Sequence, residues 1–236
     1  METPPPPPRS LHDPDAMFAQ IRALVSEVRD PHVRALLLAF LDDPEIAAPF
    51  RVAPAAKGIH HAFLGGLCEH TLSVLQLGWR ICDHYPQLDR DLVTAGALLH
   101  DIGKCREISP APGFEYSDEG KLVGHLVLTC QLIREKAARI EGFPRDLEWQ
   151  LTHLVVAHHG KHEYGSPKEP VTLEAMVVHA LDELDTRVSS FGQLMAQAPG
   201  RWTESKNLYR RQLLKTAAPP DDPRRFPGPG LYREGK

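Results

Sequence analysis

The sequence predicts an all-α fold, and two observations lead to that prediction. Apolar residues recur at helical spacing in one segment after another, and no segment alternates as a half-buried β-strand does. Prolines, glycines and aspartates lie between these segments, at the positions where helices are expected to begin and end. At 236 residues, 42% hydrophobic and 25% charged, the chain is long enough for one globular domain with appendages.

The first half predicts four helices behind a proline-rich tail. Residues 1–12 include five consecutive prolines and predict an N-terminal tail that is disordered or resembles a polyproline II helix. The expected helices cover residues 13–28, 31–42, 67–84 and 89–104, with Pro31 at a first turn and Asp89 as an N-cap. Residues 44–58 hold three prolines and predict a loop or short helical turns, and residues 13–58 are expected to pack on the main domain.

The second half predicts helices over residues 118–140, 144–160 and 172–195, the last of them capped by Thr172. One more amphipathic, basic helix is expected over residues 201–215. Loops 106–117 and 160–171 contain proline and glycine, and from Ala217 onward the composition predicts a flexible basic tail. Residues 59–200 therefore form the main domain, and residues 201–236 an appendage.

Composition narrows the class of protein. A net charge of −4 argues against a surface that coats nucleic acid through basic charge alone. No stretch reaches the ~18 apolar residues of a membrane span, and no signal peptide precedes the prolines, so a soluble, cytoplasmic protein is expected. The four cysteines, which form no C-x-x-C pair and fit a reducing compartment, are Cys68, Cys82, Cys105 and Cys130.

Thirteen histidines are unusual for this length. Taken singly, a histidine on an apolar helix face is more often structural than functional. Here, however, seven His and Asp residues lie on or beside the apolar faces of five predicted helices, and burying them separately would be costly. They are His70, His100, Asp101, His125, His158, His159 and Asp182. A shared metal centre would satisfy all of them.

Seven ligands exceed what one ion normally takes, so two ions sharing a carboxylate are predicted. Imidazole and carboxylate suit manganese first here, with iron, cobalt, nickel or zinc as alternatives. Two such ions ~3.5–4 Å apart can polarise phosphoryl oxygens and activate water. Adjacent helical residues point about 100° apart, so one of His158 and His159 could lie behind the ligand set unless the helix ends there.

The order of these motifs resembles the HD-domain superfamily of metal-dependent phosphohydrolases, and the YhaM-type 3′→5′ exoribonucleases in particular. The similar segments, which fall within residues 50–195, are His60–Thr71, His100–Lys104, Ala157–Gly160, Tyr164–Lys168 and His179–Asp185. The resemblance implies an HD-domain helical bundle over the main domain. It also implies that His70, His100, Asp101 and Asp182 hold one ion, while Asp101 bridges to a second held by His125, His158 and His159.

Further residues are candidates around that centre. Asp101 and Lys104 are the predicted catalytic residues, and Lys104, one turn beyond His100, could reach a phosphate or be a solvated helix-end lysine. His61, or equally His60, could face substrate. Ser166 and Lys168 could bind a phosphate or sugar, or form a surface turn. Asp185, one turn after Asp182, is expected to orient a ligand from outside the metal's coordination sphere.

The leading hypothesis is a phosphodiesterase acting at the 3′ end of single-stranded RNA or DNA. The exoribonucleases it resembles carry an oligonucleotide-binding domain ahead of the HD domain, and the residues before the resemblance show no strand pattern for one. An alternative is therefore a phosphohydrolase of a small nucleotide or cyclic dinucleotide, although the loop after His159 lacks the Gly-Tyr-Pro signature of cyclic-dinucleotide enzymes. A third is a catalytically idle nucleotide-binding module. A homo-oligomer is compatible with each.

Overall fold

The computed structural model describes residues 7–58, 61–111 and 113–215 and confirms the all-α prediction. Within these residues the only β-pairing is a set of isolated bridges. The helices are α1 (Pro14–Ser26), α2 (Pro31–Leu41), α3 (Pro44–Val52), α4 (Gly66–His84), α5 (Arg90–Leu99), α6 (Lys104–Glu107), α7 (Asp118–Leu122), α8 (His125–Ala137), α9 (Arg145–Ala157), the 3₁₀ helix η1 (His162–Tyr164) and α10 (Leu173–Gln197).

Three helices begin in the same way. In α1, α2 and α3 an aspartate side chain accepts backbone N–H bonds at the N-cap and a proline takes the first helical position. The pairs are Asp13-Pro14, Asp30-Pro31 and Asp43-Pro44. The predicted helices at 13 and 31 are therefore present. Of the loop or short helical turns expected over residues 44–58, the helical alternative is present in the first part as α3, where Pro44 takes the first helical position.

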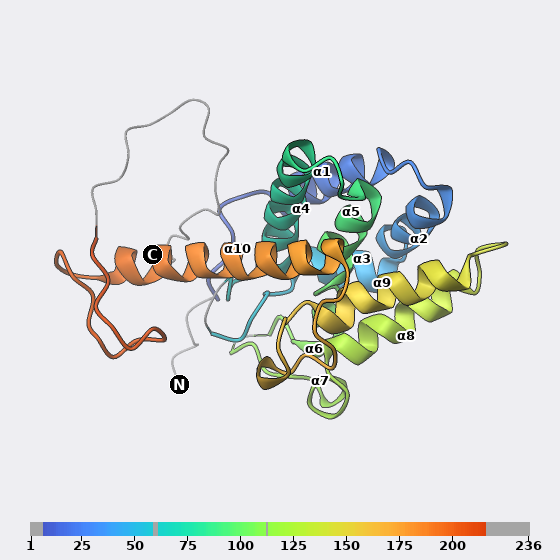
Figure 1. Ribbon diagram of the computed structural model, residues 1–236. Coiled ribbons are helices and arrows are strands. Elements are labelled where there is room, and N and C mark those ends of the chain that lie inside the picture. The colour runs from blue at the N-terminus through green and yellow to red at the C-terminus, as the bar shows by residue number, and fades with distance from the viewer. Residues whose placement is uncertain (1–6, 59–60, 112, 216–236) are drawn as a thin grey trace.

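The core lies around α4 and α5. Helix α4 contacts α1, α3, α5 and α10, while α5 also contacts α2, α9 and α10. Figure 1 shows α10 running across these two helices, with α8 and α9 lying side by side next to them. The helices that carry the predicted ligands are thus packed against one another around one centre.

Two predicted helices are shorter than expected. The helix expected over 118–140 is divided into α7 and α8 because Gly124 adopts φ +78°, a backbone conformation that ends α7 and lets α8 start at His125. The helix expected to reach Lys104 ends at Leu99 and is followed by a turn. That turn packs closely, since a Cβ on Gly103 would lie 2.5 Å from the backbone oxygen of His125.

The chain ends also differ from expectation where they are described. Ser10 N–H donates to the Leu64 carbonyl and Leu64 N–H to the Pro8 carbonyl, each at 2.8 Å, so residues 8–10 pair with the segment that precedes α4. The basic helix predicted over residues 201–215 is absent from the structure, in which α10 is the last helix of the described residues. There the Asn207 amide bonds the Glu204 and Arg211 carbonyls, a local alternative to helical pairing.

The remaining parts of both predicted tails, residues 1–6 and 216–236, lie outside the described residues. In the part of the chain that is described, every helix is too short or too polar to cross a bilayer.

Candidate metal centre

Helix ends bring most of the predicted ligands together. His100 and Asp101 follow α5 directly, His125 is the first residue of α8, and His158 and His159 follow α9. His70 and Asp182 come from within α4 and α10. Because α9 ends at Ala157, His158 and His159 both reach the centre, with ring centroids 4.2 Å apart.

The first group of ligand atoms, here called the inner cluster, consists of His70, His100, Asp101 and Asp182. One donor atom from each lies within 4.8 Å of the others. The Nε2 atoms of His70 and His100 are only 3.1 Å apart, and Asp182 Oδ1 is 3.2 Å from His70 Nε2. Two ring nitrogens can share this space only if a proton or a cation lies between them.

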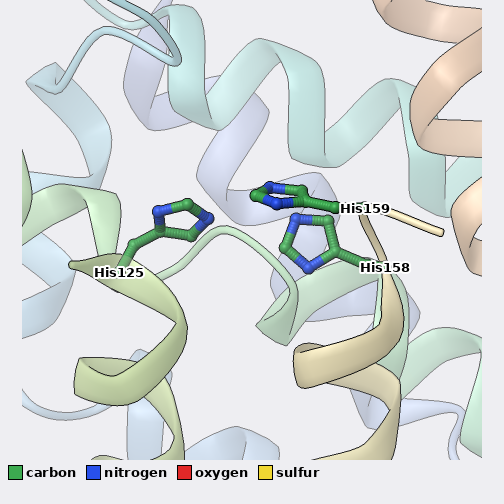
Figure 2. A group of neighbouring side chains, drawn as sticks. All are labelled: His125, His158 and His159. Atoms are coloured by element: carbon green, nitrogen blue, oxygen red, sulfur yellow. The ribbon is translucent and has the colours of Figure 1, made fainter. Parts of the chain in front are cut away.

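The second group, here called the outer cluster, consists of His125, His158 and His159, again with donor atoms within 4.8 Å of one another. Figure 2 shows the three rings gathered at the facing ends of α8 and α9. Asp101 Oδ1 lies 3.5 Å from His125 Nε2 and 3.6 Å from His158 Nε2. Its other oxygen, Oδ2, faces the inner cluster at 3.6 Å from His100 Nε2. Asp101 therefore lies between the two clusters.

Two of these histidines are oriented by carboxylates. His70 Nδ1 is 2.7 Å from Asp185 Oδ2, and Ser73 hydrogen-bonds the other oxygen of Asp185. His125 Nδ1 is 3.1 Å from Glu107 Oε2, while Glu107 Oε1 accepts the backbone N–H of His125 at 3.1 Å. In both residues Nδ1–H donates to the carboxylate, which leaves Nε2 facing its cluster.

Two others are oriented by backbone carbonyls. His100 Nδ1 lies 3.0 Å from the Ala97 carbonyl, and His158 Nδ1 lies 2.7 Å from the Val155 carbonyl. Each carbonyl accepts the Nδ1 proton, and this assigns the tautomer in which Nε2 keeps its lone pair. Each cluster thus contains one imidazole that donates to a carboxylate and one that donates to a carbonyl.

The carboxylates of the centre remain charged. Burial opposes the charge on Asp101, but the ammonium of Lys104, 2.6 Å from Oδ2, and the nearby imidazoles hold its pKa well below the usual range. The pKa of Asp182 is also far below the usual range, because its hydrogen bond with His70 outweighs the effect of burial. Both residues are anionic ligand candidates at neutral pH.

The imidazoles differ among themselves. Burial lowers the pKa of His100 to about 4 and that of His159 to about 4, so both are neutral at pH 7 and able to bind a cation. Burial opposes the charge on His70 as well, but hydrogen bonds with Asp182 and Asp185 outweigh it and raise its pKa to about 10. A proton on His70 therefore occupies the inner cluster when no cation does.

The donor atoms fit a pair of divalent cations. Asp101 Oδ1, His125 Nε2 and His159 Nδ1 are buried and have no hydrogen-bond partner in the structure. Leaving such an atom unsatisfied costs ~1–3 kcal/mol, more for a charged group, and a cation bound by Asp101 Oδ1 and His125 Nε2, which are 3.5 Å apart, would remove that cost for both. Neutral imidazoles with carboxylates are the ligands of manganese, iron, cobalt, nickel and zinc.

A cavity of about 220 Å³ opens beside the centre. Its lining includes Lys104 and Asp182 with both histidines that follow α9, and the other lining residues are Tyr164, His179, Glu183 and Thr186. A phosphate group entering this cavity would therefore meet an ammonium and ligand candidates of both clusters.

Three of the predicted substrate-binding residues, His61, Ser166 and Lys168, do not line this cavity. His61 has no exposed surface, and its ring centroid is 5.3 Å from that of His70, so contact with substrate would require its segment to move. The Ser166 hydroxyl is buried beside the Val156 and Lys168 carbonyls, at 2.9 and 2.8 Å, and holds the loop after the outer cluster. Lys168 is exposed. His60 lies outside the described residues.

Sequence reasoning did not identify two residues that support the clusters. Glu107 orients His125, but it stands in the charged segment Lys104-Cys105-Arg106-Glu107, where a glutamate gives no signal of a buried role. His179 Nδ1 lies 2.7 Å from the His158 carbonyl, and its ring packs where Gly160 has no Cβ. The helical spacing of His179 to Asp182 was visible, but its contact with His158 depends on how α9 and α10 pack.

Comparisons with known proteins agree with this arrangement. The family model of the HD domain matches residues 67–187. The chain is 36% identical over 192 residues to the 3'-5' exoribonuclease YhaM of Shouchella clausii, which covers 81% of this chain and 59% of that protein. It is 37% identical over 191 residues to the 3'-5' exoribonuclease YhaM of Bacillus subtilis, with 80% and 59% covered.

The YhaM of Halalkalibacterium halodurans is 35% identical over 204 residues, with 86% of this chain and 63% of that protein covered. The matched region thus spans about three fifths of the length of these curated relatives. No solved structure matches the chain.

Proposed function

The chain belongs to the HD-domain family, and from that premise we propose that it is a metal-dependent phosphodiesterase acting at the 3′ end of single-stranded RNA or DNA. The observation that carries the proposal is the position of Asp101, whose two oxygens face two separate groups of imidazoles. The substrate class is taken from the similar proteins, which are named as 3'-5' exoribonucleases.

The proposed ligands follow the two clusters. His70, His100, Asp101 and Asp182 would hold one cation, while His125, His158 and His159 would hold a second, with Asp101 shared between them. We propose manganese as the resident ion, with iron, cobalt, nickel or zinc as alternatives, because carboxylates accompany the imidazoles. Asp185 and Glu107 would position His70 and His125 from behind.

When bound, two such cations polarise a phosphoryl group and lower the pKa of an attacking water. The protein's own residues position the substrate. Lys104 donates to Asp101 and lines the cavity, and an ammonium with three N–H donors can also bind a phosphate oxygen there. The phosphodiester at the 3′ end would then lie against the ligand set, and its hydrolysis would release a mononucleotide.

The test is substrate profiling of the full chain with Mn²⁺. Single-stranded RNA and DNA labelled at the 5′ end are offered beside small nucleotides, cyclic dinucleotides and simple phosphodiesters. We expect a ladder shortened one nucleotide at a time from the 3′ end. Asp101→Ala should abolish that ladder, whereas Asp146→Ala, which changes an exposed aspartate in the first turn of α9, should preserve it.

Cleavage of small nucleotides without cleavage of any oligonucleotide would contradict the proposed substrate and favour the small-nucleotide alternative. Purified protein that stays metal-free in excess Mn²⁺ and hydrolyses nothing would contradict the enzyme itself and favour an idle binding module.

A further inference from the structure

One exposed aromatic side chain lies at the edge of the cavity. Tyr164 is 59% exposed, yet it lines the 220 Å³ cavity together with His159 and Lys104. A single exposed aromatic residue needs no explanation by itself. The position of this one, beside both a ligand candidate of the outer cluster and an ammonium, does call for one.

The loop that carries Tyr164 is held firmly. Gly160, at φ +81°, starts the loop directly after His159, and Gly165, at φ +85°, ends the short helix η1 directly after Tyr164. The buried Ser166 hydroxyl bonds two backbone carbonyls, and His162 Nδ1 donates to the Ser166 carbonyl at 2.9 Å. Tyr164 is thus exposed on a turn that the hydrogen bonds of Ser166 and His162 hold in place. Removal of the Tyr164 ring would leave these bonds intact.

The surroundings of the ring suit a nucleotide. Lys161 Nζ lies 5.8 Å from the Tyr164 ring centroid, within the range of a cation–π contact. A Cβ on Gly165 would lie 3.9 Å from His159 Nδ1, so the loop passes close to the outer cluster. A phosphate at the clusters would therefore have an aromatic face nearby, within the same cavity.

From these contacts we infer that Tyr164 is a binding residue for the nucleobase of the 3′-terminal nucleotide, on which that base stacks while its phosphate lies at the metal centre. The inference rests on the proposed function and adds a subsite to it. Because every base has a π face, stacking on one tyrosine should favour nucleic-acid ends over simple phosphodiesters without selecting one base.

The experiment combines a change in the protein, at residue 164, with a change in the substrate, the removal of the 3′-terminal base. Wild-type, Tyr164→Ala and Tyr164→Phe proteins, loaded with Mn²⁺, are assayed on two 5′-labelled oligonucleotides that differ only in whether the 3′-terminal nucleotide carries a base. Tyr85→Ala is the matched control, since Tyr85 is similarly exposed but lies at the far end of α4 and does not line the cavity.

We expect Tyr164→Ala to lower kcat/KM on the intact oligonucleotide by roughly 5- to 150-fold, mostly through KM, which is the range for one stacked base. Removing the base should cost the wild type a similar factor, and the two changes together should cost little more than either. Tyr164→Phe and Tyr85→Ala should behave as wild type on both substrates.

Equal losses on the intact and abasic ends in Tyr164→Ala would overturn the inference, because the ring would then act only through the loop, and so would no loss on either end. Loss of activity in Tyr164→Phe would assign the role to the hydroxyl instead and would also overturn it. If the wild type cleaves neither oligonucleotide while hydrolysing small phosphoesters, the proposed function itself fails, which these variants would not otherwise show.

Discussion

The inner cluster combines two imidazoles with two carboxylates, whereas the outer cluster consists of three imidazoles, and the two also differ in burial and in hydrogen bonding. His70 and His100 of the inner cluster have no exposed surface, and their ring nitrogens contact each other and Asp182. The outer cluster adjoins the cavity, and His125 Nε2 and His159 Nδ1 there lack any hydrogen-bond partner.

This difference indicates distinct roles for the two clusters. Without a cation, a proton on His70 can close the inner cluster, whereas His125 Nε2 and His159 Nδ1 of the outer cluster have no protein hydrogen-bond partner. Because the histidines of the inner cluster are buried and the outer cluster adjoins the cavity, we expect the inner cation to be retained during purification and the outer one to exchange more readily. Substitutions that act on one cluster, or on both, test whether the two clusters bind their cations separately.

The largest effect is expected from Asp101→Ala, because it removes the only carboxylate that faces both clusters among the described residues. It should reduce binding at both clusters and lower hydrolysis by more than the roughly 10- to 100-fold that follows loss of a residue behind a ligand. Metal content by elemental analysis and oligonucleotide cleavage measure this, with circular dichroism to verify folding. A variant that still binds two cations with full turnover would refute a shared ligand.

Asp185→Asn should act on the inner cluster alone. The change removes the charge behind His70 Nδ1 while nearly preserving shape, so affinity for the inner cation should fall by roughly 10- to 100-fold. Calorimetric titration of metal-free protein with Mn²⁺ would resolve the two sites. Ser73→Ala, which removes only a hydroxyl bonded to Asp185, should have a smaller effect in the same direction. An effect confined to the weaker, exchangeable site would contradict this assignment.

Glu107→Gln should weaken only the outer, more exchangeable site. An amide can still accept the backbone N–H of His125, so the start of α8 is kept, but the carboxylate behind His125 Nδ1 is lost. The outer cation should bind roughly 10-fold or more weakly, with the inner one unchanged. Glu135→Gln, on an exposed part of α8, is the matched control. Loss of both cations, or no change in either, would show that Glu107 only caps the helix.

Much of the site could be anticipated from local patterns. His70, His100, Asp101 and Asp182 lie on or beside apolar helical faces, and a polar group in such a position must be satisfied by something. Aspartate-proline pairs likewise indicate where α1 and α2 begin. The aspartate accepts N–H groups of the first helical turn, and the fixed φ of proline suits the first helical position, so both effects are confined to a few residues. Such interactions are local, and the sequence by itself determines them.

Other features depended on tertiary packing. The start of α8 at His125 requires both the φ of Gly124 and the distant carboxylate of Glu107, and the reach of His159 requires α9 to end at Ala157. The two oxygens of Asp101 face different clusters only because α4, α8, α9 and α10 pack around the turn that follows α5. Contacts between residues far apart in the chain leave no periodic trace along it. The sequence therefore determined which side chains are available, and only the folded structure decided which atom of each faces which neighbour.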